Sequence, residues 1–402
     1  MRERQAPGAG MSSAMQPPVP VATSSPHERR QSTNGRGFPV QESHFRQRIA
    51  PGEALPARDE ARPSLLELGP TRQGTTAMHI VIPDDYQDVI RSLDCFARLR
   101  DSGHSVELFH DAESDPQRLA ERFASADALV LTRERTRIDE ALLARLPRLK
   151  LISQTGKIAA HLDLDACTRR GVAVAEGRGS PIAPAELAWT LILNARRRLL
   201  PAIAAFREGR WQTNIGERLA GLTLGIWGYG KIGQRLARYA QAFEMPVLVW
   251  GSEASRQAAV AHGHRAAASR EAFFAEADVL TLNLRLSPST RHIVGFDDLA
   301  RMKPDALLVN VSRAELIAPG ALLRALDAGR PGFAALDVFE QEPILDPAHP
   351  LPNHPRVLCT PHLGYVEKHG YELYFGDAFD NLLAFFAGQP LNLANPQVLA
   401  ER

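Results

Sequence analysis

The sequence predicts an α/β protein with two parallel-sheet domains and a ligand cleft between them. Short apolar strand patterns alternate with helical patterns from Met78 onwards, a glycine-rich turn separates a strand from a helix, and polar residues follow several strand ends. Alternating strands and helices with short connections are typical of parallel sheets covered by helices. A chain of 402 residues has room for two or three domains of about 100–200 residues each.

The first cycle of strands and helices begins at Met78, and its first strand, 79–82, ends at the turn residue Pro83. Further strands are predicted over 105–109, 128–131 and 149–153, and helices over 86–102, 116–125 and 139–146. A second cycle starts at Leu222 and runs past Leu336. Two such units leave a cleft between them, and clefts at domain junctions are where ligands usually bind.

The composition is that of a soluble globular protein, with 44% hydrophobic residues, 23% charged residues and a net charge of +1. The near-zero charge gives no indication of a nucleic-acid partner. No apolar run approaches the ~18–20 residues of a membrane span. The three cysteines, Cys95, Cys167 and Cys359, are far apart, which argues against a disulfide framework or a zinc module. We therefore predict a cytoplasmic protein without a membrane, nucleic-acid or metal partner.

Residues 1–77 differ from the rest of the chain. They hold 10 of the 29 prolines, and their 10 arginines and 7 acidic residues give this segment a charge of +3. Low hydrophobicity and many Pro, Gly and Ser residues leave too little apolar burial to offset chain entropy, so disorder is predicted. Two alternatives stay open: an Arg-rich targeting peptide, and translation that begins at Met78.

The strongest motif is the glycine-rich turn Gly228-Tyr229-Gly230-Lys231-Ile232-Gly233. An apolar strand pattern (222–227) precedes it and a helical pattern (234–243) follows, which is the context that a dinucleotide-binding turn requires. Gly228 allows the tight turn, Gly230 lets the backbone approach a pyrophosphate, and Gly233 permits close helix–strand packing. The free N–H groups at the helix start, at Lys231 and Ile232, favour an anion there. The alternative is a glycine-rich turn without a ligand.

The next strand, 247–250, is expected to end beside the adenosine ribose of the cofactor. An acidic residue there would indicate NAD, but Gly251 occupies the position. Glu253 is a candidate displaced ribose ligand, whereas Ser252 and Arg256 are candidates for holding a 2′-phosphate. Arg256 is equally compatible with an ordinary solvated position. The sequence therefore predicts NAD or NADP and does not choose between them.

Three polar residues follow later strand patterns: Arg313 after 307–312, Glu342 after 333–339 and His362 after 357–361. The carboxyl ends of parallel strands form the ligand edge of an open sheet. A histidine can give a proton to a forming alkoxide, a carboxylate beside it fixes its tautomer, and an arginine can grip a substrate carboxylate with two hydrogen bonds. This set suits hydride exchange at an oxygen-bearing carbon. Glu340 in place of Glu342, and purely structural roles, are the alternatives.

These motifs resemble the D-isomer-specific 2-hydroxyacid dehydrogenase family. The resemblance rests on the turn 228–233 and the segments 310–313, 335–343 and 360–362, in this order and at these separations, and it covers Met78 to Arg402. It implies that Arg313 binds substrate and takes part in catalysis, that Glu342 is the carboxylate partner, and that His362 is the general acid/base. It also implies cofactor contacts at Asp337 and Gly364.

The resemblance implies two Rossmann/flavodoxin-like parallel-sheet domains, with the cofactor domain inserted into the substrate domain. The substrate domain would comprise 78–180 and 364–402, and the NAD(P)-binding domain 181–363. The helical pattern 184–198 is similar to a helix that crosses between the family's domains, and together with 206–211 it implies a homodimer. The alternative for this helix is a buried core position.

The sequence departs from the family at three places. Gln154-Thr155-Gly156-Lys157 replaces the usual Gly-Val-Gly loop, Ala160-His161 replaces an Asp-Asn pair, and Asn283 replaces a histidine. The backbone N–H groups of Gly156 and Lys157 remain candidates for holding the substrate carboxylate. The Lys157 ammonium either adds an anion contact or faces solvent.

The reaction that follows from the resemblance is reversible NAD(P)H-dependent reduction of a small 2-oxo acid to a D-2-hydroxy acid. An NAD(H)-sensing, corepressor-like binding protein on the same fold is the alternative from another class, because a fold alone does not establish turnover. The Glu342–His362 pairing argues against a third possibility, a formate dehydrogenase.

Overall fold

The computed structural model describes residues 77–400, so the predicted disorder of 1–77 lies outside the described residues, Ala77 apart. Its first sheet contains five parallel strands in the order β2-β1-β3-β4-β5. The strands are β1 (His79–Ile82), β2 (Ser105–Leu108), β3 (Ala128–Leu131), β4 (Leu151–Gln154) and β5 (Ala173–Glu176). The central strands β3 and β4 are buried on both faces, as expected for a parallel sheet covered by helices.

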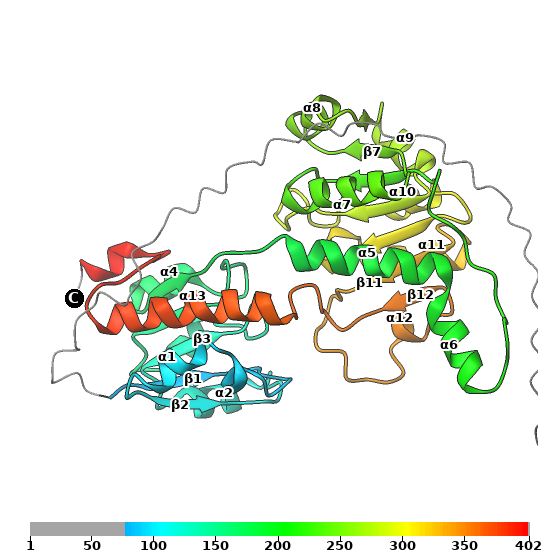
Figure 1. Cartoon of the computed structure of the whole chain (residues 1–402). Coiled ribbons are helices and arrows are strands. Elements are labelled where there is room, and N and C mark those ends of the chain that lie inside the picture. Colours follow the sequence, from blue (N-terminus) through cyan, green and yellow to red (C-terminus); the bar gives the residue numbers. More distant parts are fainter. Residues whose placement is uncertain (1–76, 401–402) are drawn as a thin grey trace, which may run out of the picture. The chain divides into compact units, whose positions relative to one another are not determined.

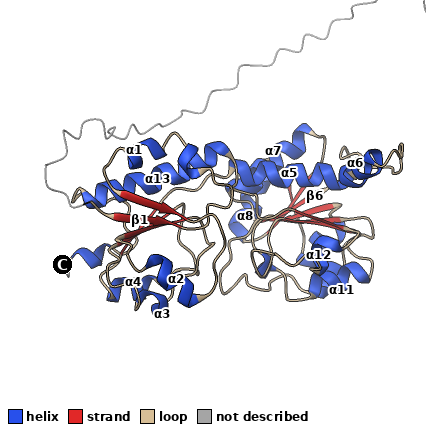
Figure 2. Ribbon diagram, turned by 90° about the horizontal axis from the view of Figure 1, so that it is seen from below, coloured by secondary structure: helices blue, strands red, loops and turns tan. Residues whose placement is uncertain are grey.

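Helices cover both faces of this sheet (Figure 2). One face carries α1 (Phe96–Arg100) and α13 (Lys368–Phe386), and the other carries α2 (Pro116–Phe123), α3 (Glu140–Leu143) and α4 (Leu164–Arg169). The long helix predicted over 86–102 is wrong in extent: it is a 3-10 turn, η2 (Ile90–Ser92), followed by the short α1. The two pieces are separate because Leu93 is extended, with ψ of 141°.

The second sheet contains seven parallel strands in the order β12-β11-β10-β9-β6-β7-β8. They are β6 (Leu224–Trp227), β7 (Val247–Trp250), β8 (Arg265–Ala266), β9 (Val279–Leu282), β10 (Leu307–Asn310), β11 (Phe333–Leu336) and β12 (Val357–Cys359). The strand order reverses direction between β6 and β9, so the turn after β6 lies at the switch point where open α/β sheets bind ligands.

The helices of the second unit also form two layers. On one face lie α5 (Ile182–Arg197) and α7 (Lys231–Ala242), and on the other lie α9 (Arg270–Glu276), α10 (Phe296–Ala300) and α11 (Ala321–Asp327). Three further helices are α6 (Leu199–Arg207), α8 (Glu253–Ala261) and α12 (Pro350–Asn353), and the 3-10 turns η3 (Ala314–Leu316) and η4 (Pro396–Leu399) complete the list. The predicted fold class, α/β with two parallel sheets, is confirmed.

The C-terminal segment returns to the first sheet after the second sheet is complete (Figure 1). Its helix α13 packs against β4 and β5, where Ser153 Oγ donates a 2.7 Å hydrogen bond to the Ala378 carbonyl. The first strand and the last long helix of the described chain therefore share one apolar core, which includes Ile80 and Phe379. Over residues 77–400, no helix is both long enough and apolar enough to span a membrane.

Candidate active site

The glycine-rich turn lies between β6 and α7, as predicted, and its three glycines meet different constraints. Gly228 has φ of 98°, and a Cβ there would lie 2.7 Å from the Asn283 carbonyl oxygen. A Cβ on Gly233 would lie 2.3 Å from the Gly228 carbonyl oxygen. Gly230 is different, because nothing lies within 4 Å of the Cβ that a larger residue would carry.

The open space at Gly230 is what the approach of a pyrophosphate requires. Gln234 is the first residue of this helix whose N–H bonds back into the turn, to the Gly230 carbonyl oxygen at 2.9 Å. The N–H groups before it, at Lys231, Ile232 and Gly233, form the positive end of α7. The turn therefore fits a dinucleotide cofactor.

The residues after β7 are arranged around the start of α8. Ser252 is the N-cap of this helix, because its Oγ accepts a hydrogen bond from the Ser255 N–H. The Arg256 guanidinium lies 4.8 Å from the centre of the Trp250 ring and forms a 2.6 Å ion pair with Glu253. Ser252, Glu253 and Arg256 thus lie together at the end of β7, where the ribose ligand was predicted.

Arg313 follows β10 in a loop that the buried Asn310 holds in shape. The Asn310 carboxamide accepts the Ser312 N–H at 3.0 Å and donates to the Arg313 carbonyl oxygen at 2.8 Å. The Arg313 guanidinium donates from Nη1 to the Ser312 carbonyl and from Nη2 to the carboxylate of Glu134, which belongs to the loop after β3 of the first sheet. This ion pair joins the carboxyl edges of the two sheets at one point.

His362 and Glu342 lie in direct contact. The imidazole Nδ1 is 2.6 Å from Glu342 Oε2, while Glu342 Oε1 accepts the Phe339 N–H at 2.8 Å. Both side chains remain about one third exposed, so the imidazole Nε2 is left for another partner. His362 has φ of 52°, a left-handed conformation that is uncommon for residues other than glycine and recurs at functional sites.

The carboxylate of Asp337 holds the turn that carries His362. It is fully buried and accepts hydrogen bonds from Thr360 Oγ1 at 2.7 Å, from the Leu363 N–H at 2.7 Å and from the Gly364 N–H at 2.8 Å. Burial raises the pKa of Asp337, and the three hydrogen bonds act in the opposite direction. Asp337 and the Gly364 N–H are therefore hydrogen-bonded to each other. Their contacts with the cofactor stay a prediction.

The loop after β4 contains the two residues that were predicted to hold a substrate carboxylate. Gly156 has φ of 87°, and the guanidinium of Arg133 lies where its side chain would be, 2.0 Å from an ideal Cβ. The Lys157 ammonium forms a 2.5 Å ion pair with Glu176. Of the two predicted uses of the Lys157 side chain, the structure shows the solvent-facing one: the side chain is exposed, and its ammonium pairs with a carboxylate of its own sheet.

Sequence reasoning missed the loop 132–136. It brings Glu134 to Arg313, and it brings Arg133 to Gly156 and to the ring of Tyr365, whose centre lies 5.4 Å from that of His362. A signal was available, because these charged residues directly follow a predicted strand, which is the criterion that identified Arg313. That criterion alone did not single them out, because most charged residues in loops are solvated.

His161, which replaces the family's Asn, is mostly buried beside this loop. Its Nε2 lies 3.1 Å from Gln154 Oε1, whereas its buried Nδ1 has no hydrogen-bond partner among the described residues. Burial lowers the pKa of His161 to about 4, against an opposing effect of the Glu134 carboxylate. The imidazole is therefore neutral at pH 7.

This shift predicts a pH-dependent stability. Since the pKa is about 4 in the folded chain and 6.5 in the unfolded chain, the unfolded chain binds more protons between these values. Stability is complete above pH 6.5, falls as the pH drops towards 4, and the total loss is about 3 kcal/mol. We expect His161→Asn to flatten the dependence of the urea-unfolding free energy on pH in this window. The exposed His369→Asn is the control, and an equally steep profile for both variants would contradict the assignment.

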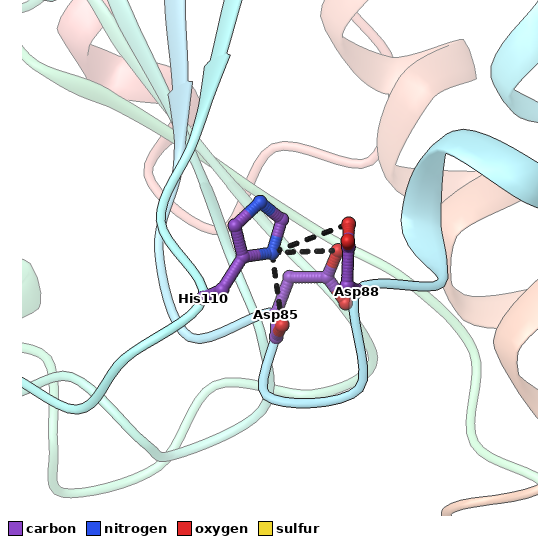
Figure 3. Close-up of side chains that lie close together, drawn as sticks. All are labelled: Asp85, Asp88 and His110. Atoms are coloured by element: carbon purple, nitrogen blue, oxygen red, sulfur yellow. Dashed lines mark hydrogen bonds and ion pairs between the residues drawn. The ribbon is translucent and has the colours of Figure 1, made fainter.

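A separate cluster of side chains joins the loops after β1 and β2, where Asp85 and Asp88 of the first loop and His110 of the second point toward one another (Figure 3). The Asp85 carboxylate already accepts the N–H groups of Val89 and Ile90, at 3.1 and 3.2 Å. The His110 Nδ1 lies 3.2 Å from the Asp85 carbonyl oxygen. These contacts fix the loop at the start of η2, and we assign the cluster no other role.

The arrangement defines a class of protein: a dinucleotide-binding oxidoreductase whose chemistry takes place at the carboxyl edges of its parallel sheets. Comparison with known proteins agrees. Residues 189–364 match the family model described as D-isomer specific 2-hydroxyacid dehydrogenase, NAD binding domain. The glyoxylate reductase of Aeropyrum pernix is 35% identical over 311 residues, which cover 74% of this chain and 92% of that protein.

Solved structures give the same result. A phosphoglycerate oxidoreductase from Vibrio cholerae is 55% identical, with a TM-score of 0.74 over 77% of this chain and 98% of that one. A Ralstonia solanacearum oxidoreductase is 49% identical, with a TM-score of 0.78 over 80% of this chain and 98% of that one. The chain belongs to the D-isomer-specific 2-hydroxyacid dehydrogenase family. It is an NAD(P)-dependent oxidoreductase of 2-hydroxy acids.

Proposed function

We propose that this enzyme reversibly reduces a small 2-oxo acid to the D-2-hydroxy acid, with His362 as the proton donor. The single observation that carries the proposal is the 2.6 Å contact between His362 Nδ1 and Glu342. With Nδ1 held by a carboxylate, Nε2 carries the transferable proton toward the substrate carbonyl oxygen. The chemistry that a bound nicotinamide supplies here is hydride transfer to C2.

The remaining residues bind and orient the substrate. Arg313 places a guanidinium at the carboxyl edge of the second sheet, where it can grip a carboxylate and polarise the neighbouring carbonyl. In this proposal, the N–H groups of Gly156 and Lys157 hold the same carboxylate from the first sheet. Asp337 acts on His362 through the turn 360–364, and it is therefore a positioning residue. In the reverse direction, His362 takes the proton from the substrate hydroxyl.

The test is an assay with purified protein that follows absorbance of the reduced nicotinamide. Glyoxylate, hydroxypyruvate, pyruvate and phosphohydroxypyruvate form the first panel, because relatives of this chain are named glyoxylate reductase, hydroxypyruvate reductase and phosphoglycerate dehydrogenase. Oxidation of the reduced cofactor that depends on an added 2-oxo acid supports the proposal. Cofactor binding without turnover of any of them would favour the corepressor-like alternative.

We also propose that the enzyme accepts NADPH as well as NADH. Ser252 and Arg256 lie at the start of α8, and Gly251 follows β7 in place of the acidic residue that would repel a 2′-phosphate. Glu253 pairs with Arg256 from an exposed position, from which it can turn away. We expect Arg256→Ala to lower kcat/KM for NADPH about tenfold, the value of one charge-assisted hydrogen bond, and to leave NADH within twofold. Equal losses with both cofactors would contradict this role.

We propose a homodimer formed through an apolar surface on α6 and the segment after it. This surface, which we call the α6 surface, consists of exposed Leu199, Leu200, Ile203, Phe206 and Trp211. Phe206 and Trp211 are 64% and 74% exposed, and their rings pack edge to face 5.7 Å apart. Contiguous exposed apolar side chains of this size mark interaction sites.

The α6 surface gives a direct prediction. Phe206→Glu combined with Trp211→Glu places two charges in the contact, so we expect sedimentation to show a shift from dimer to monomer. Val260→Glu, an exposed apolar position on α8, is the matched control and should leave the mass unchanged. The proposed interface would be refuted if the wild-type protein were monomeric, or if the variant with both glutamates remained a dimer.

Two further proposals follow the same family pattern. We divide the chain into a substrate domain, 78–180 with 364–402, and a cofactor domain, 181–363, which is supported by the return of α13 to the first sheet. We propose the cytoplasm as the compartment, because Cys95, Cys167 and Cys359 all carry free thiols. Burial raises the pKa of each thiol to about 12, so these cysteines are unreactive.

A further inference from the structure

Arg133 occupies a strained position that two buried side chains maintain. It directly follows Thr132 at the end of β3 and has φ of 53°, in the left-handed region that residues other than glycine seldom adopt. Its N–H donates to Thr155 Oγ1 at 2.7 Å, and its carbonyl oxygen accepts Gln154 Nε2 at 2.7 Å. Thr155 and Gln154 are both buried. Strain of this kind costs free energy and persists only where the surroundings impose it, commonly at ligand sites.

The strained backbone directs the Arg133 side chain into the site already described. Nη1 donates to the Thr155 carbonyl at 3.3 Å and lies against Gly156, 2.0 Å from where a Cβ would be. The guanidinium carbon is 5.4 Å from the ring centres of both Tyr365 and Tyr374. Since the Tyr365 ring also packs against His362, this guanidinium lies between the Gly156 loop and a ring in contact with the proposed proton donor.

The charge of Arg133 is not neutralised within the part of the chain that the structure describes. No carboxylate there lies within 4.0 Å of its guanidinium, although its neighbour Glu134 is acidic. The Glu134 carboxylate is engaged with Arg313, whose Nη1 is in turn occupied by its own Ser312 carbonyl. Arg313 therefore enters the site with one guanidinium nitrogen already paired to a carboxylate. Arg135, in the same loop, likewise has no carboxylate within 4.0 Å among the described residues, but its Nη1 donates to the Asp84 carbonyl and its guanidinium lies over the Tyr86 ring. Of these two arginines, Arg133 is the one that lies against Gly156.

We propose that Arg133 is a substrate-binding residue that holds the carboxylate of the 2-oxo acid beside Gly156, together with Arg313. A planar guanidinium matches a carboxylate with two parallel hydrogen bonds, and partial burial strengthens them. This inference rests on the proposed function. A Cβ at Gly156 would force the guanidinium to shift, and the φ of 87° at this position independently favours glycine. The inference gives the strained backbone of Arg133 a role at the site.

The test compares Arg133→Gly with the wild type, because glycine keeps the left-handed backbone without strain. We expect KM for the best 2-oxo acid to rise at least tenfold, kcat to change less than threefold, and the Kd for NADH to stay unchanged. Guanidinium ions at a non-denaturing concentration should restore part of the loss, which a structural role would not show. Arg137→Gly, at an exposed arginine directly after this loop, is the matched control and should leave KM unchanged.

Binding of oxamate, a 2-oxo acid mimic that cannot be reduced, separates this inference from the proposed function. Calorimetry with the NADH-loaded wild type should detect oxamate, and Arg133→Gly should weaken its binding at least tenfold. If no 2-oxo acid is turned over but oxamate binding still requires Arg133, the result supports the carboxylate-binding role of Arg133 and contradicts the proposed reaction. Unchanged oxamate binding in the variant would overturn the inference. The inference would also be overturned if Arg133→Gly lost affinity only for 2-oxo acids that carry a second anionic group, because Arg133 would then bind that group and not the 2-oxo carboxylate.

Discussion

His362→Ala should lower kcat about 10³-fold and leave the Kd for the reduced cofactor nearly unchanged. General acid catalysis by a positioned side chain contributes about 10²–10⁴-fold, and the variant removes the only proposed proton donor. The cofactor turn at 228–233 is a different element, so fluorescence titration with NADH should give the wild-type affinity. An unchanged kcat would remove His362 from the mechanism.

Two further variants separate the chemistry from the backbone strain at this position. His362→Asn introduces a residue that tolerates the φ of 52° at this position but cannot donate the proton. Its loss of activity should therefore equal that of the alanine variant. Glu342→Gln retains a hydrogen-bonding side chain but removes the charge beside Nδ1, and its loss should be smaller, about 10–100-fold. His369→Ala, an exposed histidine on α13, should have full activity.

Arg313→Met should lower kcat/KM about 10³-fold, mainly through KM. Two charge-assisted hydrogen bonds to the substrate carboxylate are lost, and each is worth about 1.5–3 kcal/mol. Steady-state kinetics over a range of 2-oxo acid concentrations measures the effect. A loss below tenfold would show that Arg313 is not a principal substrate ligand.

The ion pair of Arg313 with Glu134 complicates this variant, because methionine leaves a half-buried carboxylate without its partner. Arg313 holds the pKa of Glu134 below its usual range, although burial acts in the opposite direction. The double variant Arg313→Met with Glu134→Gln removes that charge. If substrate binding is the role of Arg313, the double variant stays as inactive as the single one. Recovery of activity would show that the single variant fails because of the unpaired carboxylate.

Much of the fold was predictable because its signals are local. Strands 128–131 and 247–250 were located to the residue, since a run of apolar residues bounded by polar ones specifies a buried parallel strand. The extent of the helix predicted over 86–102 was wrong, because the same apolar spacing fits the short η2 and α1, which pack on the same core. The return of α13 to the first sheet came from the family resemblance, since no local pattern specifies a contact with a strand more than 200 residues earlier.

The sequence by itself determined the chemistry: a glycine turn between a strand and a helix, and Arg313, Glu342 and His362 after three strand ends. Their residue types and spacing are properties of the chain, and they identify the family without coordinates. Only the tertiary structure decided which groups meet. In the structure, Glu342 contacts His362, and the Asp337 carboxylate accepts hydrogen bonds from the turn 360–364. Lys157 pairs with Glu176, and Arg133 lies against Gly156. The physical reason is that these contacts join separate loops, whose meeting depends on how the strands are ordered in each sheet.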